Sequence, residues 1–222
     1  MRFHKPVAAA LAFTAIAGLA ACGDNEEPAE TGAPAATDAP ATNAPVAKID
    51  SLSGQGTSVT LDPSFLAGLT SLKLTPGTVG SAKIEGAVAT FPITGGNVTY
   101  FTPGSVSPYV QGKINHDGSG LSLTGGGTKV ELTNFVVDPA GSVLTGKVTA
   151  NGKGAAESAP LVFLDGRTLK PLQTGPADTA ILEGTTVSLT KEAADLLNKT
   201  YGTTALTQYF KVGVAKITVN TK

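Results

Sequence analysis

The segment Gly56–Leu61, with the sequence GTSVTL, recurs near the end of the chain as Gly184–Leu189, with the sequence GTTVSL. Both copies are rich in Thr and Val, which is typical of β-strands. Each copy precedes a helical pattern and then a second strand, and these second strands also match, at Val79–Ile84 and Val212–Ile217. We interpret the pattern as an internal repeat that opens and closes one pseudo-symmetric β domain. The alternative is a chance likeness between strands of similar composition.

Two short helices are predicted, one directly after each copy of the repeat. Asp62 followed by Pro is a helix-start signal, because the Asp side chain caps free backbone N–H groups and Pro suits the first helical position. The first predicted helix is Pro63–Leu72. The second, Lys191–Tyr201, has Thr190 as its cap and ends before Gly202, which suits a helix C-terminus. The apolar residues at helical spacing are Phe65, Leu69 and Leu72, and Ala193, Leu196, Leu197 and Tyr201. We expect Phe65, Leu69, Leu196 and Leu197 to be buried against the sheet.

Residues 48–222 are predicted to form a single, mainly β domain. The stretch is long enough to bury one good core. Turn signals such as Thr94–Asn97 and Asn151–Gly152 separate short segments in which side chains alternate. This pattern is typical of an antiparallel β-sandwich or barrel-like domain, here with the two short helices. Shared faces are expected for Val110, Ile114 and His116, for Leu121 and Leu123, for Val130 and Leu132, and for Leu144 and Val148.

The N-terminal segment has the pattern of a bacterial lipoprotein signal peptide. Basic residues at Arg2, His4 and Lys5 precede the uncharged run Val7–Ala21. This run is shorter than the roughly 20 residues that span a bilayer. It leads into Cys22 through the sequence LAAC, which resembles the lipobox, whose Cys is acylated and becomes the new N-terminus.

We therefore expect residues 1–21 to be removed and the mature chain to be held on the bacterial cell envelope, outside the cytoplasm, by acyl chains on Cys22. The alternative is an ordinary cleaved secretory signal with a Cys nearby. Residues 22–47 are rich in Ala, Pro and Thr, and are predicted to be a disordered tether. The folded domain is then 48–222.

Charge and cysteine content exclude several classes of function. The chain has 16 Lys plus Arg and 17 Asp plus Glu, a net charge of −1. Without the signal peptide and tether, 14 basic and 12 acidic residues remain. This balance argues against a nucleic-acid-binding protein. A single Cys allows neither an internal disulfide nor a Cys-based zinc site.

No sequence motif points to catalysis or to a metal site, so no enzyme is expected. The segments Gly118–Gly120 and Gly125–Gly127 do not open a helix, and we interpret them as hairpin turns rather than phosphate loops. His116 is the one candidate for chemistry, because it is the only imidazole in the expected mature chain. It either contacts or orients a ligand, or it is a structural residue that hydrogen-bonds the adjoining turn.

The middle of the domain resembles the HtaA-type domain, an envelope-anchored haem-binding domain of Gram-positive haem uptake. The order of parts matches over most of 56–219. The resemblance implies a β-rich, sandwich-like fold with short helices, and ligand-contacting roles for Phe65, His116 and Tyr209. The matching parts are Phe65 in the first helix, Phe91-Pro92 before a Gly-Gly turn, Gly112–Gly118, Leu121–Leu123, Leu144–Val148, and Tyr209-Phe210 with Gly213.

One position departs from the family pattern. In the family, a haem-ligating Tyr follows the Phe of the first helix by three positions, and a His supports it. Here Gly68 stands three positions after Phe65, whereas His116 corresponds to the supporting His. The resemblance therefore implies the fold and the location more strongly than it implies haem.

Two classes of function follow. The chain is a cell-envelope lipoprotein with a non-catalytic binding domain for haem or another small apolar ligand, or it is a structural or protein-interaction module of the envelope. The expected partners are the membrane, through Cys22, and either such a ligand or an envelope protein. No cofactor is expected apart from haem. A concave apolar pocket next to His116 would favour the first class. A filled core with a flat apolar patch would favour the second.

Overall fold

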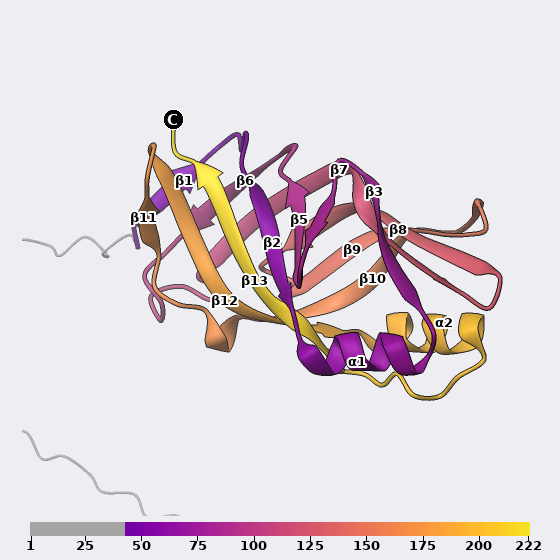
Figure 1. Cartoon of the computed structure of the whole chain (residues 1–222). Coiled ribbons are helices and arrows are strands. Elements are labelled where there is room, and N and C mark those ends of the chain that lie inside the picture. Colours follow the sequence, from indigo (N-terminus) through magenta and orange to yellow (C-terminus); the bar gives the residue numbers. More distant parts are fainter. Residues whose placement is uncertain (1–42) are drawn as a thin grey trace, which may run out of the picture. The chain divides into compact units, whose positions relative to one another are not determined.

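The computed structural model of the chain describes residues 43–222. They form one curled antiparallel β-sheet, with two α-helices along its lower side in Figure 1. The mainly β, barrel-like fold with two short helices that the sequence predicts is thus confirmed. The signal peptide, Cys22 and most of the tether lie outside the described residues. Within 43–222, no helix is long and apolar enough to cross a membrane.

The strands follow one another in a single sheet that curls around the interior of the domain. The order is β1-β6-β7-β8-β9-β10-β12-β13-β2-β5-β4, with β11 beside β12 and β3 beside β7, and neighbouring strands are antiparallel. The elements are β1 (Ala47–Ile49), β2 (Gly56–Leu61), α1 (Pro63–Ser71), β3 (Thr75–Gly80), β4 (Lys83–Glu85), β5 (Val88–Pro92), β6 (Gly95–Tyr100), β7 (Val110–Gly125), β8 (Thr128–Asp138), β9 (Val143–Ala150), β10 (Lys153–Asp165), the short 3-10 helix η1 (Gly166–Thr168), β11 (Gln173–Gly175), β12 (Thr179–Leu189), α2 (Lys191–Tyr201) and β13 (Lys211–Asn220).

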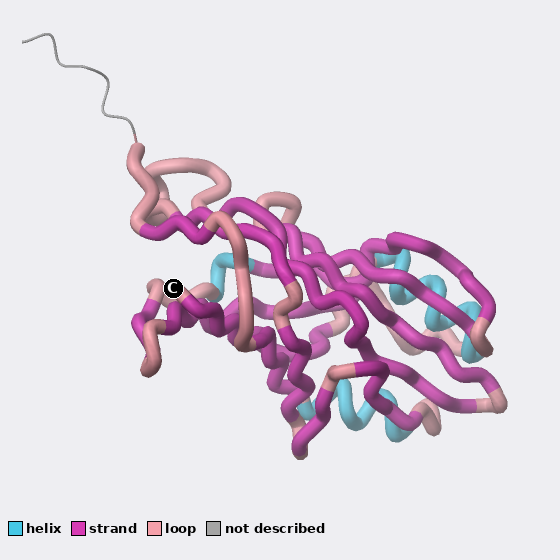
Figure 2. The backbone as a smooth tube through the Cα atoms, turned by 90° about the horizontal axis from the view of Figure 1, so that it is seen from above, coloured by secondary structure: helices cyan, strands magenta, loops and turns pink. Residues whose placement is uncertain are grey.

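A bend between β5 and β6 brings distant parts of the sheet together. β5 pairs with β2, whereas β6, which follows it directly, pairs with β7. At the bend, the Thr94 N–H donates to the carbonyl of Asn115 at 2.9 Å. The segment that contains β5 and β6 is therefore shared between two walls of the curled sheet. Figure 2 shows from above how the strands curve away from a flat sheet.

Both copies of the repeat lie next to β13. β2 pairs with one edge of β13 and β12 with the other, and each leads into a helix, so the copies occupy related positions. The predicted match between the second strands does not extend to the structure. Val79–Ile84 is divided between β3, which pairs with β7, and β4, which pairs with β5, whereas Val212–Ile217 lies within β13. Gly80, at φ 60°, turns the chain out of β3 and breaks the symmetry.

The helices begin at the predicted caps. The Asp62 carboxylate accepts the N–H of Ser64 at 2.9 Å, and the Thr190 hydroxyl accepts an N–H of the first turn of α2 at 3.1 Å. α2 ends at Gly202 in the left-handed conformation, as predicted, and α1 ends at Ser71, one residue early. Of the helix residues expected in the core, Leu69 and Leu197 are buried, and Phe65 and Leu196 are half-buried.

The sheet begins slightly before the expected domain boundary at Lys48. β1 starts at Ala47, and the N–H of Val46 donates to the carbonyl of Tyr100 at 2.8 Å. The pairing of β1 with β6 satisfies backbone groups of residues that the composition assigns to the tether. The folded part therefore includes the last residues of that predicted segment.

Candidate functional site

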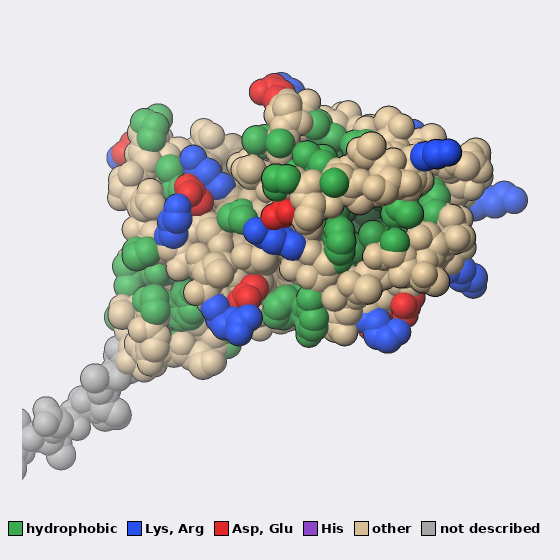
Figure 3. Space-filling view, turned by 60° about the horizontal axis from the view of Figure 1, so that its bottom comes forward, with side chains coloured by type: hydrophobic (Ala, Val, Ile, Leu, Met, Phe, Trp, Pro, Cys, Tyr) green, Lys and Arg blue, Asp and Glu red, His purple; other side chains and the backbone are tan. Residues whose placement is uncertain are grey.

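An apolar cavity lies inside the curled sheet and is also lined by both helices. Its volume is about 120 Å³, within about 960 Å³ of space free of protein atoms that includes open solvent. Its lining residues include no Asp, Glu, Lys or Arg, and only Thr57, His116 and Ser122 are polar. On the helix side of the domain, brought forward in Figure 3, hydrophobic side chains border a hollow in the surface. The domain is therefore not packed solid behind its sheet.

The alternation of side chains along the strands explains why apolar groups gather in the cavity. Along β2, every second residue faces it, at Thr57, Val59 and Leu61. On β7, Leu121 and Leu123 line it, as their predicted common face implies, and Ser122 between them also reaches it. The alternation of inward and outward side chains, which identified the strands in the sequence, therefore also identified much of the cavity wall.

His116 is the most buried polar ring of the site, with 1% of its surface exposed. It lies at a bulge, where the pairing of β7 with β8 shifts between His116 and Gly120. Nδ1 lies 2.9 Å from the carbonyl oxygen of Pro92, and Nε2 lies 3.2 Å from the hydroxyl oxygen of Thr57. A carbonyl oxygen only accepts, so Nδ1 carries the proton and donates it. Nε2 of the neutral ring then accepts the hydroxyl proton of Thr57.

Burial lowers the pKa of His116 below its usual value of 6.5, against the opposing effects of backbone hydrogen bonds at Pro92 and Phe91 and of the Asp117 carboxylate. The ring is therefore neutral at pH 7, with both nitrogens in hydrogen bonds. It does not hydrogen-bond the adjoining turn, which was the structural alternative from the sequence. It joins β7 instead to β2 and to the end of β5, which are remote in sequence.

Aromatic rings form two groups at the cavity. Phe91 packs edge-on against Phe135, with ring centroids 5.3 Å apart, and lies 6.4 Å from the His116 ring. On the helix side, Phe65 lines the cavity and packs against Phe210 at 6.4 Å. Such large side chains hold their rotamers by mutual packing, which stiffens the wall.

The structure brings together two of the three candidate ligand-binding residues. Phe65 and His116 line the same cavity, whereas Tyr209 is 61% exposed, does not line it, and packs against Phe163 at 5.6 Å. At Gly68, a Cβ atom would lie 3.4 Å from the ring of Phe210. The Phe210 ring therefore occupies the space beside α1 into which a longer side chain at position 68 would extend.

An ion pair ties the start of α1 to β13. Asp62 and Lys211 are joined at 2.9 Å. Hydrogen bonds from the side chain of Ser64 and from Lys211 lower the pKa of the Asp62 carboxyl to about 2. The contact positions the helix that carries Phe65. Within the described residues, no group of three or more His, Cys, Asp or Glu side chains could hold a metal ion.

The role of Thr57 was missed from the sequence, where it counted only as part of the repeat. It is 5% exposed and bonds a His that lies 59 positions away. The signal for it was weak: an inward-facing Thr on a strand whose other inward residues are Val59 and Leu61. A polar side chain on an apolar face indicates a buried partner, but not which one.

The fold is that of a known class of domain. The C-terminal domain of HtaA from Corynebacterium glutamicum is similar to this chain, with a TM-score of 0.54 over 76% of this chain and 97% of that domain, at 14% sequence identity. The sequence matches no protein-family profile and no curated protein. The chain therefore has an HtaA-like fold, as its sequence resemblance implied, and at this identity the likeness shows the fold alone.

Proposed function

We propose that this chain is a non-catalytic binding domain of the bacterial cell envelope that takes a small apolar ligand into the cavity. The observation that carries the proposal is an apolar cavity beside His116, in a domain whose interior would otherwise be close-packed. Because no Asp, Glu, Lys or Arg lines it, the buried part of the ligand carries no charge. The resemblance of the sequence to HtaA-type haem-binding domains implies the same class, and the HtaA-like fold agrees with that resemblance.

The residues of the cavity do not fit iron coordination. Haem iron in proteins is held by a side chain such as His, Cys, Met or Tyr. Both nitrogens of His116 are in hydrogen bonds, Gly68 offers no side chain, and Tyr209 does not line the cavity. A bound haem would be held by apolar contacts alone. We therefore propose a ligand that needs no coordinating residue.

The proposed location rests on the lipobox-like sequence that ends at Cys22. Acylation of this residue would make the membrane the first partner of the chain, and the cavity would receive the second, a small apolar molecule. Under the alternative, in which the domain is a structural or interaction module, the second partner is an envelope protein and the cavity stays empty.

Binding of a neutral fluorescent probe, N-phenyl-1-naphthylamine, to residues 23–222 tests the proposal. We expect saturable, stoichiometric binding. Leu132→Asp, which places a carboxylate on the wall, should abolish it because burying an unpaired charge is costly. Ala155→Asp, on an exposed residue of β10, is the matched control and should bind normally. A folded wild-type protein that takes up no probe would contradict the proposal and favour the alternative module.

A haemin titration, followed in the Soret region, tests the absence of an iron ligand. We expect weak binding that His116→Gln leaves unchanged. Gly68→Tyr combined with Phe210→Ala restores a phenol beside α1 and removes the ring that crowds it, so this double variant should bind haemin more tightly. Tight, stoichiometric binding by the wild type would refute this part of the proposal.

A further inference from the structure

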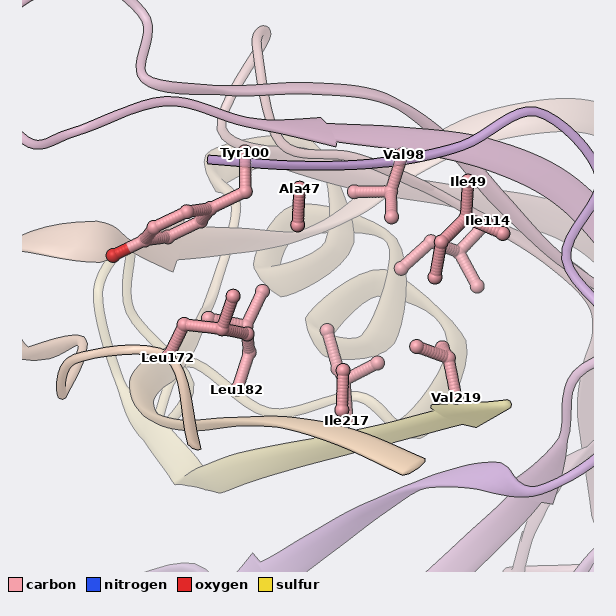
Figure 4. Close-up of a pocket in the computed structure, with 10 residues that line it drawn as sticks. Ala47, Ile49, Val98, Tyr100, Ile114, Leu172, Leu182, Ile217 and Val219 are labelled. Carbon is pink, nitrogen blue, oxygen red and sulfur yellow. The ribbon is translucent and has the colours of Figure 1, made fainter. Parts of the chain in front are cut away.

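A second apolar cavity lies in another part of the sheet interior, where β1 and β6 face β12 and β13. Its volume is about 30 Å³, within about 420 Å³ of space free of protein atoms that includes open solvent. Figure 4 shows Val98 and Ile114 on one wall pointing toward Leu182 and Ile217 on the other. Tyr100 is its only polar lining residue. Like the first cavity, it offers mostly apolar walls without Asp, Glu, Lys or Arg.

Residues that line the two cavities are neighbours on two walls near the Thr57–His116 pair. On β7, Ile114 lines the second cavity, and His116, two residues further on the same face, lines the first. On another wall, Ile217 of β13 pairs directly with Thr57 of β2. Ile217 lines the second cavity and Thr57 the first. The 3.2 Å hydrogen bond between Thr57 and His116 therefore joins the two walls where the lining of one cavity gives way to that of the other.

We propose that the two cavities are parts of one channel for the acyl chain of a lipid, and that Thr57 and His116 form a partition that limits the length of chain accepted. This inference rests on the proposed function and names its ligand class. Apolar walls without Asp, Glu, Lys or Arg in both cavities suit a hydrocarbon. The small second cavity, in line with the first along β7, suits a linear chain rather than a wide planar ring.

The partition is stable because its polar atoms satisfy one another. Thr57 pairs with Nε2 of His116, and Nδ1 pairs with the carbonyl of Pro92, so no buried polar atom of the bridge is left without a partner. Replacing either side chain with a smaller one removes part of the volume that separates the cavities and joins them. Each additional methylene buried beyond it should then raise affinity about fourfold.

Displacement of a fluorescent fatty-acid probe from residues 23–222 by decanoate and octadecanoate tests the partition. This segment retains all of the described residues 43–222. In the wild type, octadecanoate should gain little over decanoate, because the longer chain meets the partition. His116→Ala and Thr57→Ala should each raise the affinity for octadecanoate relative to decanoate by about tenfold or more. Thr57→Ala is the milder change and keeps the test valid if His116→Ala does not fold.

Two control variants separate the partition from general loosening. Thr57→Val removes the hydrogen bond but keeps the volume, so it should leave the length preference unchanged. Leu121→Ala enlarges the first cavity on the same strand, away from the partition, and should change the affinities for both fatty acids alike.

Three outcomes would overturn the inference. If decanoate binds but His116→Ala and Thr57→Ala both keep the wild-type preference between decanoate and octadecanoate, the partition alone is refuted. Binding of N-phenyl-1-naphthylamine without any fatty acid would refute the acyl class but leave the proposed function standing. Failure of the wild type to bind either probe would refute both.

Discussion

His116 should make the domain less stable as the pH falls from 7 toward 5. Burial lowers the pKa of the folded ring below 6.5, whereas the unfolded ring keeps its ordinary pKa. Below pH 6.5 the unfolded chain therefore binds a proton that the folded chain does not. The stabilisation is fully present above the unfolded pKa and is lost as the pH falls toward the folded pKa.

The size of the effect follows from this difference in bound protons. One proton taken up only by the unfolded state lowers the free energy of unfolding by about 1.4 kcal/mol per pH unit. A fall from pH 6.5 to pH 5 therefore costs at most about 2 kcal/mol. The carboxyls of Asp62 and Asp165, with pKa values of about 2, do not interfere, because unfolded carboxyls take up protons mainly below about pH 5.

Urea unfolding followed by circular dichroism, at intervals between pH 7.5 and pH 5, measures the slope. His116→Gln is the matched control, because its amide can donate to the Pro92 carbonyl and accept from the Thr57 hydroxyl without titrating. We expect a steep wild-type curve and a nearly flat curve for the variant. A flat wild-type curve, or the same slope in both proteins, would show that His116 is not held neutral by burial.

Three further predictions concern the helices and the anchor. Leu197→Ala should lower the free energy of unfolding by about 2–5 kcal/mol in urea titrations, because Leu197 is 5% exposed in the core under α2, and a loss below about 1 kcal/mol would contradict this packing. Thr190→Val removes the cap of α2 and its 2.7 Å hydrogen bond to the Pro160 carbonyl, and should cost about 1–2 kcal/mol in the same assay, whereas unchanged stability would show that the cap is dispensable. Cys22→Ser should move the protein from the detergent phase to the aqueous phase in Triton X-114 partitioning, and equal partitioning of both proteins would exclude the lipid anchor.

Local features of the sequence were sufficient to predict the two helices and the faces of several strands. Asp62 and Thr190 were identifiable as caps because the cap bonds lie within one helical turn. The inward side chains follow from alternation within each uninterrupted run of a strand, as for Ile114 and His116 before the bulge of β7 and for Leu121 and Leu123 after it. The resemblance to HtaA-type domains agreed with the β fold class that the turn signals and alternation predicted, and the structure confirms both.

The tertiary structure alone decided what these faces enclose. The partner of His116 is Thr57, on a strand that reaches it only because β5 and β6 divide one segment between two walls. The turn at Gly80 ended β3, so the single strand expected at Val79–Ile84 was divided between β3 and β4. Strand pairing joins residues far apart in sequence, and its register depends on all the neighbours of a strand at once. A single strand carries only the alternation of its own side chains, so it determines which residues point inward but not which residues they meet.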